Sequence, residues 1–237
     1  TGYKKIIEAI DLVGQILRGE TTIDKELEKG DEFGVGSNAF RIDVREKVLG
    51  YGQYCDDMEI DGMLHVSAVR TKYPRARILD IDYSEALKLD GVVAVLTADD
   101  VPNNKVGHIQ QDWDVMIAKG EITRYVGDAL CLVVAESEDI LKKAKSLVKV
   151  EYEVLEPVRN IDEARAENAP KVHPNGNLCQ SRHVTRGDAK TAIANSKYTV
   201  TETFDTPFTE HAFLEPECAI AMPYKDGVKI YSSDQSV

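Results

Sequence analysis

The stretch DALCLVVAESEDILKKAKSLVKVEYEVLEPV, residues 128–158, says most about the fold class. It opens on an apolar run typical of a buried strand, and residues 149–155 alternate apolar and polar side chains as a half-buried strand does. Between the two, Ser137 can cap a helix whose apolar side carries Ile140, Leu141, Ala144 and Leu147. We therefore expect strands at 129–135 and 149–155, joined by a helix at about 138–148 that packs on a sheet.

A similar unit precedes this stretch. Residues 63–69 and 77–83 alternate in the manner of strands, and residues 92–97 form another apolar run. Between the last two lies SEALKLDG, in which Ser84 can be a helix N-cap and a glycine follows the end. Two strand–helix–strand units in succession predict one compact α+β domain over residues 45–158.

The two ends of the chain have sequence patterns that differ from those of the central domain. Residues 1–19 begin with TGYKKIIEAIDLVGQIL, whose apolar residues at helical spacing predict an amphipathic helix that needs a partner. Residues 20–44 are polar and punctuated by glycine, so we expect a linker, with residues 20–40 extended or mobile. In residues 159–237 we expect an extended, turn-rich stretch at 160–182, a short helix in GDAKTAI, a strand at 198–204 and a final hairpin around the turn KDG. The chain is expected to be a piece of a longer protein.

Composition excludes some function classes. The 237 residues include 29 basic and 41 acidic side chains, for a net charge of −12, which argues against binding to nucleic acid or to an anionic membrane surface. No apolar run approaches the roughly 18 residues of a membrane span. The 4 cysteines are scattered, with Cys131 in an apolar run, and reduced thiols in a cytoplasmic protein are the favoured interpretation.

One stretch has the density of polar groups that a site needs. FTEHAFLEPECA, residues 208–219, holds Glu210, His211, Glu215 and Glu217. It contains neither HExxH nor CxxC, and its proline argues against a helix that would align metal ligands, so no metal site is predicted. Acid–base chemistry by a partly buried carboxylate or imidazole is one interpretation. A corner whose polar groups bind neighbouring backbone is the other.

Several stretches together resemble the xanthine dehydrogenase and aldehyde oxidase family. TGYKKIIEAI resembles the segment that follows two cluster-binding cysteines in the family's helical 2Fe–2S domain. LGYGQYCDDMEIDGMLHVSAVRTKYPRARILDID and RYVGDALCLVVAESEDILKKAKSLVKVEYEVLEPV resemble the two halves of its α/β hammerhead domain. VHPNGNL, RGDAKTAI and FTEHAFLEPECAIAMP resemble the entry into its molybdopterin-binding domain.

This resemblance implies a domain order. Residues 1–19 would be the last helix of an iron–sulfur domain, 20–44 a linker, 45–158 the hammerhead domain, and 159–237 the start of the molybdopterin-binding domain. The implied fold class is α+β, a hammerhead domain with an N-terminal helix and a C-terminal β-rich segment. The lack of a flavin domain between these parts is similar to single-chain aldehyde oxidoreductases and selenium-dependent xanthine dehydrogenases of anaerobic bacteria, and the second group is slightly favoured.

The resemblance also implies a reaction. Family members hydroxylate a purine, an aldehyde or another small substrate with oxygen from water, at a molybdenum–molybdopterin centre, and pass electrons to 2Fe–2S clusters. A purine or related N-heterocycle is the favoured substrate here. An aldehyde oxidoreductase, a carboxylate–histidine hydrolase and a non-catalytic hammerhead interaction module are the alternatives. A homodimer or a flavin subunit is a possible partner of the whole protein.

Four residues are implied to line the substrate and cofactor pocket: Thr209, Glu210, His211 and Glu215. Many family members carry glutamine where Thr209 stands, so a contact made by a longer amide would be absent. No catalytic residue and no metal ligand is assigned in these 237 residues. The chain by itself is expected to bind no cofactor and to be inactive.

Overall fold

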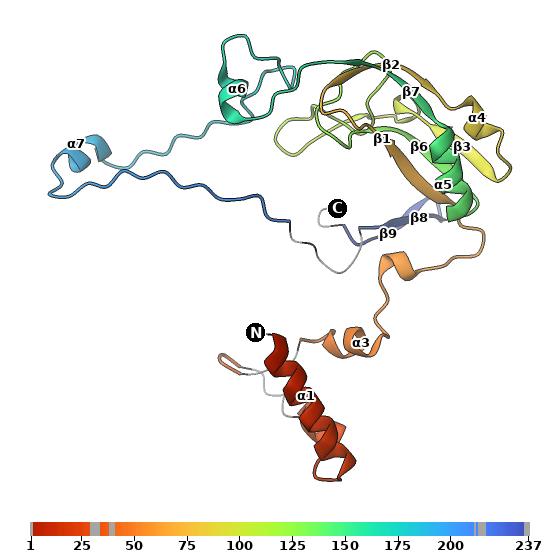
Figure 1. The fold of residues 1–237 in the computed structure, drawn as a ribbon, viewed down its shortest axis with the longest axis vertical. Helices are drawn as coiled ribbons and strands as arrows, with labels where there is room; N and C mark the ends of the chain where they lie inside the picture. The colour runs from red at the N-terminus through yellow and green to blue at the C-terminus, as the bar shows by residue number, and fades with distance from the viewer. Residues whose placement is uncertain (1, 29–33, 38–40, 211, 213–216, 235–237) are drawn as a thin grey trace. The chain divides into compact units, whose positions relative to one another are not determined.

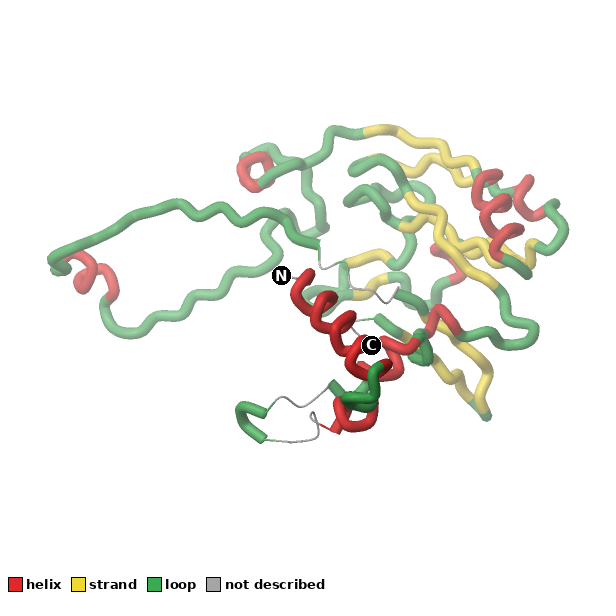
Figure 2. Tube along the Cα trace, turned by 60° about the horizontal axis from the view of Figure 1, so that its bottom comes forward, coloured by secondary structure: helices red, strands yellow, loops and turns green. Residues whose placement is uncertain are grey.

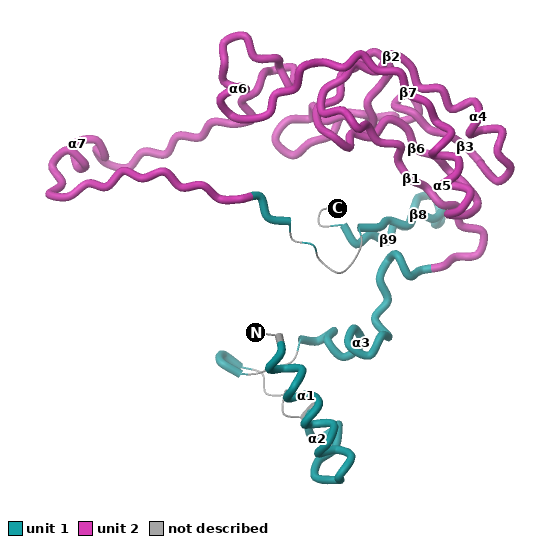
Figure 3. Tube along the Cα trace, in the orientation of Figure 1, with its two compact units in different colours: residues 1–58, 208–237 teal, residues 59–207 magenta. Residues whose placement is uncertain are grey.

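The computed structural model describes residues 2–28, 34–37, 41–210, 212 and 217–234. Its helices and strands confirm the predicted α+β class (Figure 1). The chain divides into two compact units, one of residues 59–207 and the other of residues 1–58 together with 208–237 (Figure 3).

The unit of residues 59–207 is built around a three-stranded antiparallel sheet in the order β1-β6-β3. Its strands are β1 (His65–Arg70), β3 (Val92–Leu96) and β6 (Ala129–Ala135). The central strand β6 is the predicted apolar run, and Leu130, Cys131, Val133 and Ala135 within it are each 0% exposed. A strand that is apolar at successive positions can be covered on both faces, which is why it occupies the centre.

Helix α5 (Glu138–Leu147) follows β6 and packs on this sheet. Ser137 caps it as predicted, because its Oγ accepts a hydrogen bond from the backbone N–H of Ile140 at 3.4 Å. Leu141 and Ala144 belong to the core cluster with Val133. Leu147 was predicted there too, but its side chain is 38% exposed, because the chain leaves the helix at this point and Val148 packs against the cluster instead.

A second pair of strands, β2 (Ala76–Asp82) and β7 (Lys149–Val154), forms its own antiparallel sheet. It encloses a separate cluster of Ile78, Ile117 and Leu130. All five predicted strands exist, and they are divided between two sheets. The strands on either side of α5 belong to different sheets, since β6 pairs with β1 and β3 and β7 pairs with β2. A short hairpin of β4 (Lys105–Val106) and β5 (Trp113–Asp114) completes the strands of this unit.

Three local predictions are wrong. Ser84 is the first residue of α4 (Ser84–Leu87) rather than its cap, and its N–H donates to the Asp82 carboxylate at 3.0 Å. Helix α6 (Ile161–Arg165) lies in a stretch expected to be extended, because Asn160 caps it through the N–H of Glu163. The predicted strand at 198–204 is a loop that follows α7 (Ala189–Ala194), and it pairs with no strand in the part of the chain that the structure describes (Figure 2).

The 3-10 helix η2 (Ala98–Asp100) also belongs to the unit of residues 59–207, and the unit of residues 1–58 and 208–237 holds the other elements. They are α1 (Gly2–Leu17), α2 (Ile23–Glu28), α3 (Val44–Leu49), the 3-10 helix η1 (Cys55–Asp57) and the hairpin β8 (Ala219–Tyr224) with β9 (Gly227–Ser232). The N-terminal helix and the final hairpin were predicted. Within the predicted linker, the 6 residues of α2 are helical, where an extended or mobile stretch was predicted. Part of that linker, 29–33 and 38–40, lies outside the described residues.

Candidate functional site

The four predicted pocket residues are only partly covered by the structure. Thr209 and Glu210 are exposed and lie in a segment without helix or strand. The Glu210 carboxylate accepts a long hydrogen bond from the N–H of Ala212 at 3.4 Å. His211 and Glu215 lie outside the described residues. The convergence of these four side chains on one pocket therefore stays a prediction.

The described part of residues 172–237 does not by itself enclose a pterin. It forms one short helix, loops and one hairpin, and almost all of its side chains are half-buried or exposed. Among the described residues, every buried side-chain nitrogen or oxygen already has a hydrogen-bond partner, so none is left for a cofactor to satisfy. No group of three or more histidine, cysteine, aspartate or glutamate side chains could hold a metal in the part that the structure describes. These residues therefore do not fit a complete cofactor site, and no pterin atom is assigned to them.

A cluster of shielded polar groups centres on Arg124, which the sequence analysis did not single out. Its guanidinium Nη2 lies 3.0 Å from Asp114 Oδ2, and the two side chains are only 14% and 7% exposed. Nη1 donates to the backbone carbonyl of Asp112 at 2.6 Å. Lys105 pairs with the other oxygen of Asp114. Because Arg presents a rigid planar fork of donors, it holds two segments in one geometry.

The loop at 105–114 also contacts the stretch that resembles the entry into the molybdopterin-binding domain. His173 Nδ1 lies 2.9 Å from Asp112 Oδ2, and Asn175 Nδ2 donates to Gln110 Oε1 at 3.1 Å. Asp112 thus contacts Arg124 through its carbonyl and His173 through its carboxylate. The sequence carried no local signal for the contacts of His173 and Asn175 with this loop, because both join residues more than sixty positions apart.

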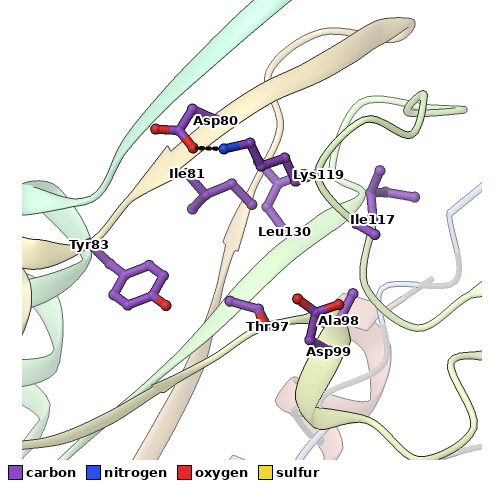
Figure 4. Close-up of a pocket in the computed structure, with 10 residues that line it drawn as sticks. Asp80, Ile81, Tyr83, Thr97, Ala98, Asp99, Ile117, Lys119 and Leu130 are labelled. Atoms are coloured by element: carbon purple, nitrogen blue, oxygen red, sulfur yellow. Dashed lines mark hydrogen bonds and ion pairs between the residues drawn. The ribbon is translucent and has the colours of Figure 1, made fainter.

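A small hollow lies in the unit of residues 59–207 (Figure 4). It measures about 230 Å³ and is lined by Asp80, Ile81, Tyr83, Thr97, Ala98, Asp99, Ile117, Ala118, Lys119 and Leu130. Lys119, the cation among these residues, is paired with Asp80 at 2.6 Å, and this hydrogen bond holds the pKa of Asp80 below its ordinary value. The hollow is smaller than the usual ligand site. Thr209 and Glu210, the two predicted pocket residues that the structure describes, are not among its lining residues.

The helices of the described residues include none that is both long and apolar enough to cross a membrane. Exposed apolar side chains instead follow one side of α1. They are Ile6 (59% exposed), Ile7 (66%), Ile10 (67%), Val13 (54%) and Leu17 (82%). A stripe of this kind on a helix is normally covered by a partner element.

Comparison with known proteins found matches over most of the chain. Residues 49–156 match the family model "aldehyde oxidase and xanthine dehydrogenase, a/b hammerhead domain", and residues 172–237 match the molybdopterin cofactor-binding domain. A probable xanthine dehydrogenase subunit of Bacillus subtilis (strain 168) is 36% identical over 79% of this chain. The nicotinate dehydrogenase large molybdopterin subunit of Eubacterium barkeri is 31% identical over 82% of it.

The fold agrees with these matches. The aldehyde oxidoreductase from Desulfovibrio gigas superposes on 98% of this chain with a TM-score of 0.77 at 28% sequence identity, over 27% of its own length. The chain spans 25% of the Bacillus relative and 45% of the Eubacterium relative. The chain thus belongs to the xanthine dehydrogenase and aldehyde oxidase family of molybdenum hydroxylases, and contains its hammerhead domain and part of its molybdopterin-binding domain.

Proposed function

We propose that this chain is part of a molybdenum hydroxylase that inserts an oxygen atom from water at an electron-poor carbon of a purine or related N-heterocycle. The observation that carries the proposal is the order of the two matched domains, hammerhead followed by molybdopterin-binding, in one chain. The relative named for nicotinate oxidation, a pyridine substrate, favours an N-heterocycle.

The chain's own residues would contribute structure around the centre. His173 ties the loop at 105–114 to the stretch that enters the molybdopterin-binding domain, and Arg124 holds that loop in place. Thr209, Glu210, His211 and Glu215 would line the pocket, orienting the substrate by hydrogen bonds. The molybdenum–pterin centre would supply the redox chemistry when bound.

Helix α1 would be the last helix of a 2Fe–2S domain. Its TGYKKIIEAI segment resembles that domain, and its exposed apolar stripe is what a helix taken from a bundle presents. The cluster would receive electrons from the molybdenum centre. A cytoplasmic location and an assembly with a second copy or with a flavin subunit are part of the same proposal.

An aldehyde oxidoreductase of the same family is the second candidate. It is favoured by the superposition on the Desulfovibrio gigas enzyme over 98% of this chain, α1 included. Both candidates share the metal centre and differ in the substrate that the pocket accepts.

The test is a substrate panel with the product of the complete reading frame that encodes these residues. Xanthine, nicotinate and benzaldehyde are offered with a dye as electron acceptor, and molybdenum, iron and selenium are measured in the same preparation. We expect stoichiometric molybdenum and dye reduction with a heterocycle. Turnover of benzaldehyde alone selects the second candidate, selenium identifies the selenium-dependent group, and turnover without molybdenum refutes both candidates.

A further inference from the structure

Two cysteines far apart in the sequence meet in the unit of residues 1–58 and 208–237. Cys55 begins η1, which packs against β8. Its Sγ donates to the backbone carbonyl of Tyr231 at 3.4 Å, and Tyr231 lies opposite Ile220 in the β8–β9 hairpin. Cys55 therefore sits over the Cys218 end of the hairpin.

Cys218 is held in place at that same end. Its N–H donates to Ser233 Oγ at 3.1 Å, and its carbonyl accepts from the Ser233 N–H at 3.0 Å, which extends the ladder by one residue pair. Alternation along the strand puts the side chains of Cys218 and Ile220 on one face. Cys55 is near enough to that face to contribute, after burial, to the raised pKa of the Cys218 thiol.

The surroundings of Cys55 and Cys218 distinguish this pair from a metal site and from the other two cysteines. No group of three or more metal-ligating side chains exists among the described residues, so the pair is not part of a metal site there. Cys55 is 8% exposed, whereas Cys218 is half-buried and within reach of a small reagent. Of the other two cysteines, Cys131 is buried in β6 and Cys179 is exposed.

We propose that Cys55 and Cys218 are a disulfide-forming pair, a modification site that fastens η1 to the start of β8. The oxidant is a small-molecule disulfide such as oxidised glutathione. One cysteine thiolate attacks it, forming a mixed disulfide and releasing one reduced glutathione. The second cysteine thiolate then attacks the mixed disulfide and releases another. Two thiol protons and two electrons pass to the glutathione pair, and one protein S–S bond remains.

The chemistry also sets the conditions under which the bond forms. Burial raises the pKa of the Cys218 thiol to about 11, and Cys55 and the Asp56 carboxylate contribute further in the same direction. Because the thiolate is the attacking species, oxidation is slow at neutral pH and accelerates as the pH rises. The bond would join Cys55, near the start of the hammerhead domain, to Cys218, and so close a long loop that restricts the unfolded chain.

The experiment treats the complete, folded chain with oxidised glutathione at pH 7, 8 and 9, traps free thiols, and maps unreduced tryptic peptides by mass spectrometry. We expect a linked pair of the peptides 48–70 and 198–225, which forms about tenfold faster per pH unit between pH 7 and 8. Cys179→Ser should leave this link intact, and Cys55→Ser and Cys218→Ser should each abolish it.

Three outcomes would overturn the proposal. They are the absence of the linked peptide in the native wild-type chain, its appearance only after unfolding in urea, and links from Cys55 or Cys218 to Cys179 that form equally fast. Because the decisive readout uses the wild-type chain, a serine variant that fails to fold does not affect it. The link is read without any activity assay, so its failure would leave the proposed hydroxylase function untouched.

Discussion

The guanidinium of Arg124 lies 3.0 Å from the carboxylate of Asp114, and both side chains are shielded from solvent. This pair, with the Arg124 bond to the Asp112 carbonyl, fixes the loop that also contacts His173. The loop is therefore the structural link between the hammerhead domain and the stretch that enters the molybdopterin-binding domain.

Replacing Arg124 by lysine tests this link. Lysine keeps the charge but cannot donate in two fixed directions, so one partner loses its hydrogen bond. We expect Arg124→Lys to lower the free energy of unfolding by about 1–3 kcal/mol in urea denaturation. The exposed pair of Arg159 with Glu156 provides the control, and Arg159→Lys should change stability by less than about 0.5 kcal/mol. Equal effects of the two changes would refute the role given to Arg124.

Asp128 closes the turn that carries Arg124. Its buried carboxylate accepts from the backbone N–H of Arg124 at 2.6 Å and from that of Tyr125 at 3.3 Å. Asp128→Ala leaves both donors without this acceptor and should cost about 2–3 kcal/mol. Asp128→Asn keeps one acceptor oxygen and should cost less. Thermal and urea unfolding measure both, and an alanine variant as stable as wild type would contradict the account.

The core under α5 gives a third prediction. Leu141 is 8% exposed and belongs to the cluster with Val133 and Ala144. Leu141→Ala should destabilise the chain by about 2–4 kcal/mol, because it leaves a cavity. Leu147→Ala, at a position 38% exposed, should cost under about 1 kcal/mol. A larger loss of stability for Leu147→Ala than for Leu141→Ala would contradict this packing of α5.

A fourth prediction concerns alkaline pH. Burial raises the pKa of the Cys131 thiol from 9.0 to about 11, so the folded state favours the neutral thiol. Its contribution to stability is fully present below pH 9 and is lost as the pH rises through 11. Cys131→Ala removes this ionisation, so its free energy of unfolding should fall less between pH 9 and 11, by at most about 2.7 kcal/mol. Denaturation curves at several pH values measure this, and parallel pH dependences in the two proteins would contradict it.

The comparison of sequence and structure separates local from long-range information. The strands β1, β2, β3, β6 and β7 and the helix capped by Ser137 were predictable, because periodicity and capping act over a few residues. The contacts of Arg124 with Asp114 and of His173 with Asp112 were not predictable, because folding alone brings those loops together. The same holds for the choice of β2 as the partner of β7.

The candidate site shows the same limit. Thr209 could be singled out only through the family resemblance, whereas Glu210 also belongs to the stretch at 208–219 that is dense in polar groups. Glu210 has a local backbone partner, the N–H of Ala212, and nothing in that contact points to a substrate. The domains that would complete the pocket determine the role of these residues, so their assignment stays a proposal.

The central claim, that these residues belong to a hydroxylase using water, is tested most directly by the origin of the inserted oxygen. The product of the complete reading frame is incubated with xanthine or nicotinate and a dye acceptor in ¹⁸O-labelled water, over enough turnovers to exceed the enzyme concentration. Mass spectrometry then counts the label in the hydroxylated product. The account predicts one ¹⁸O atom per product molecule. Product oxygen that comes from O₂, or the absence of any hydroxylated product from a molybdenum-loaded enzyme across the whole substrate panel, would contradict it.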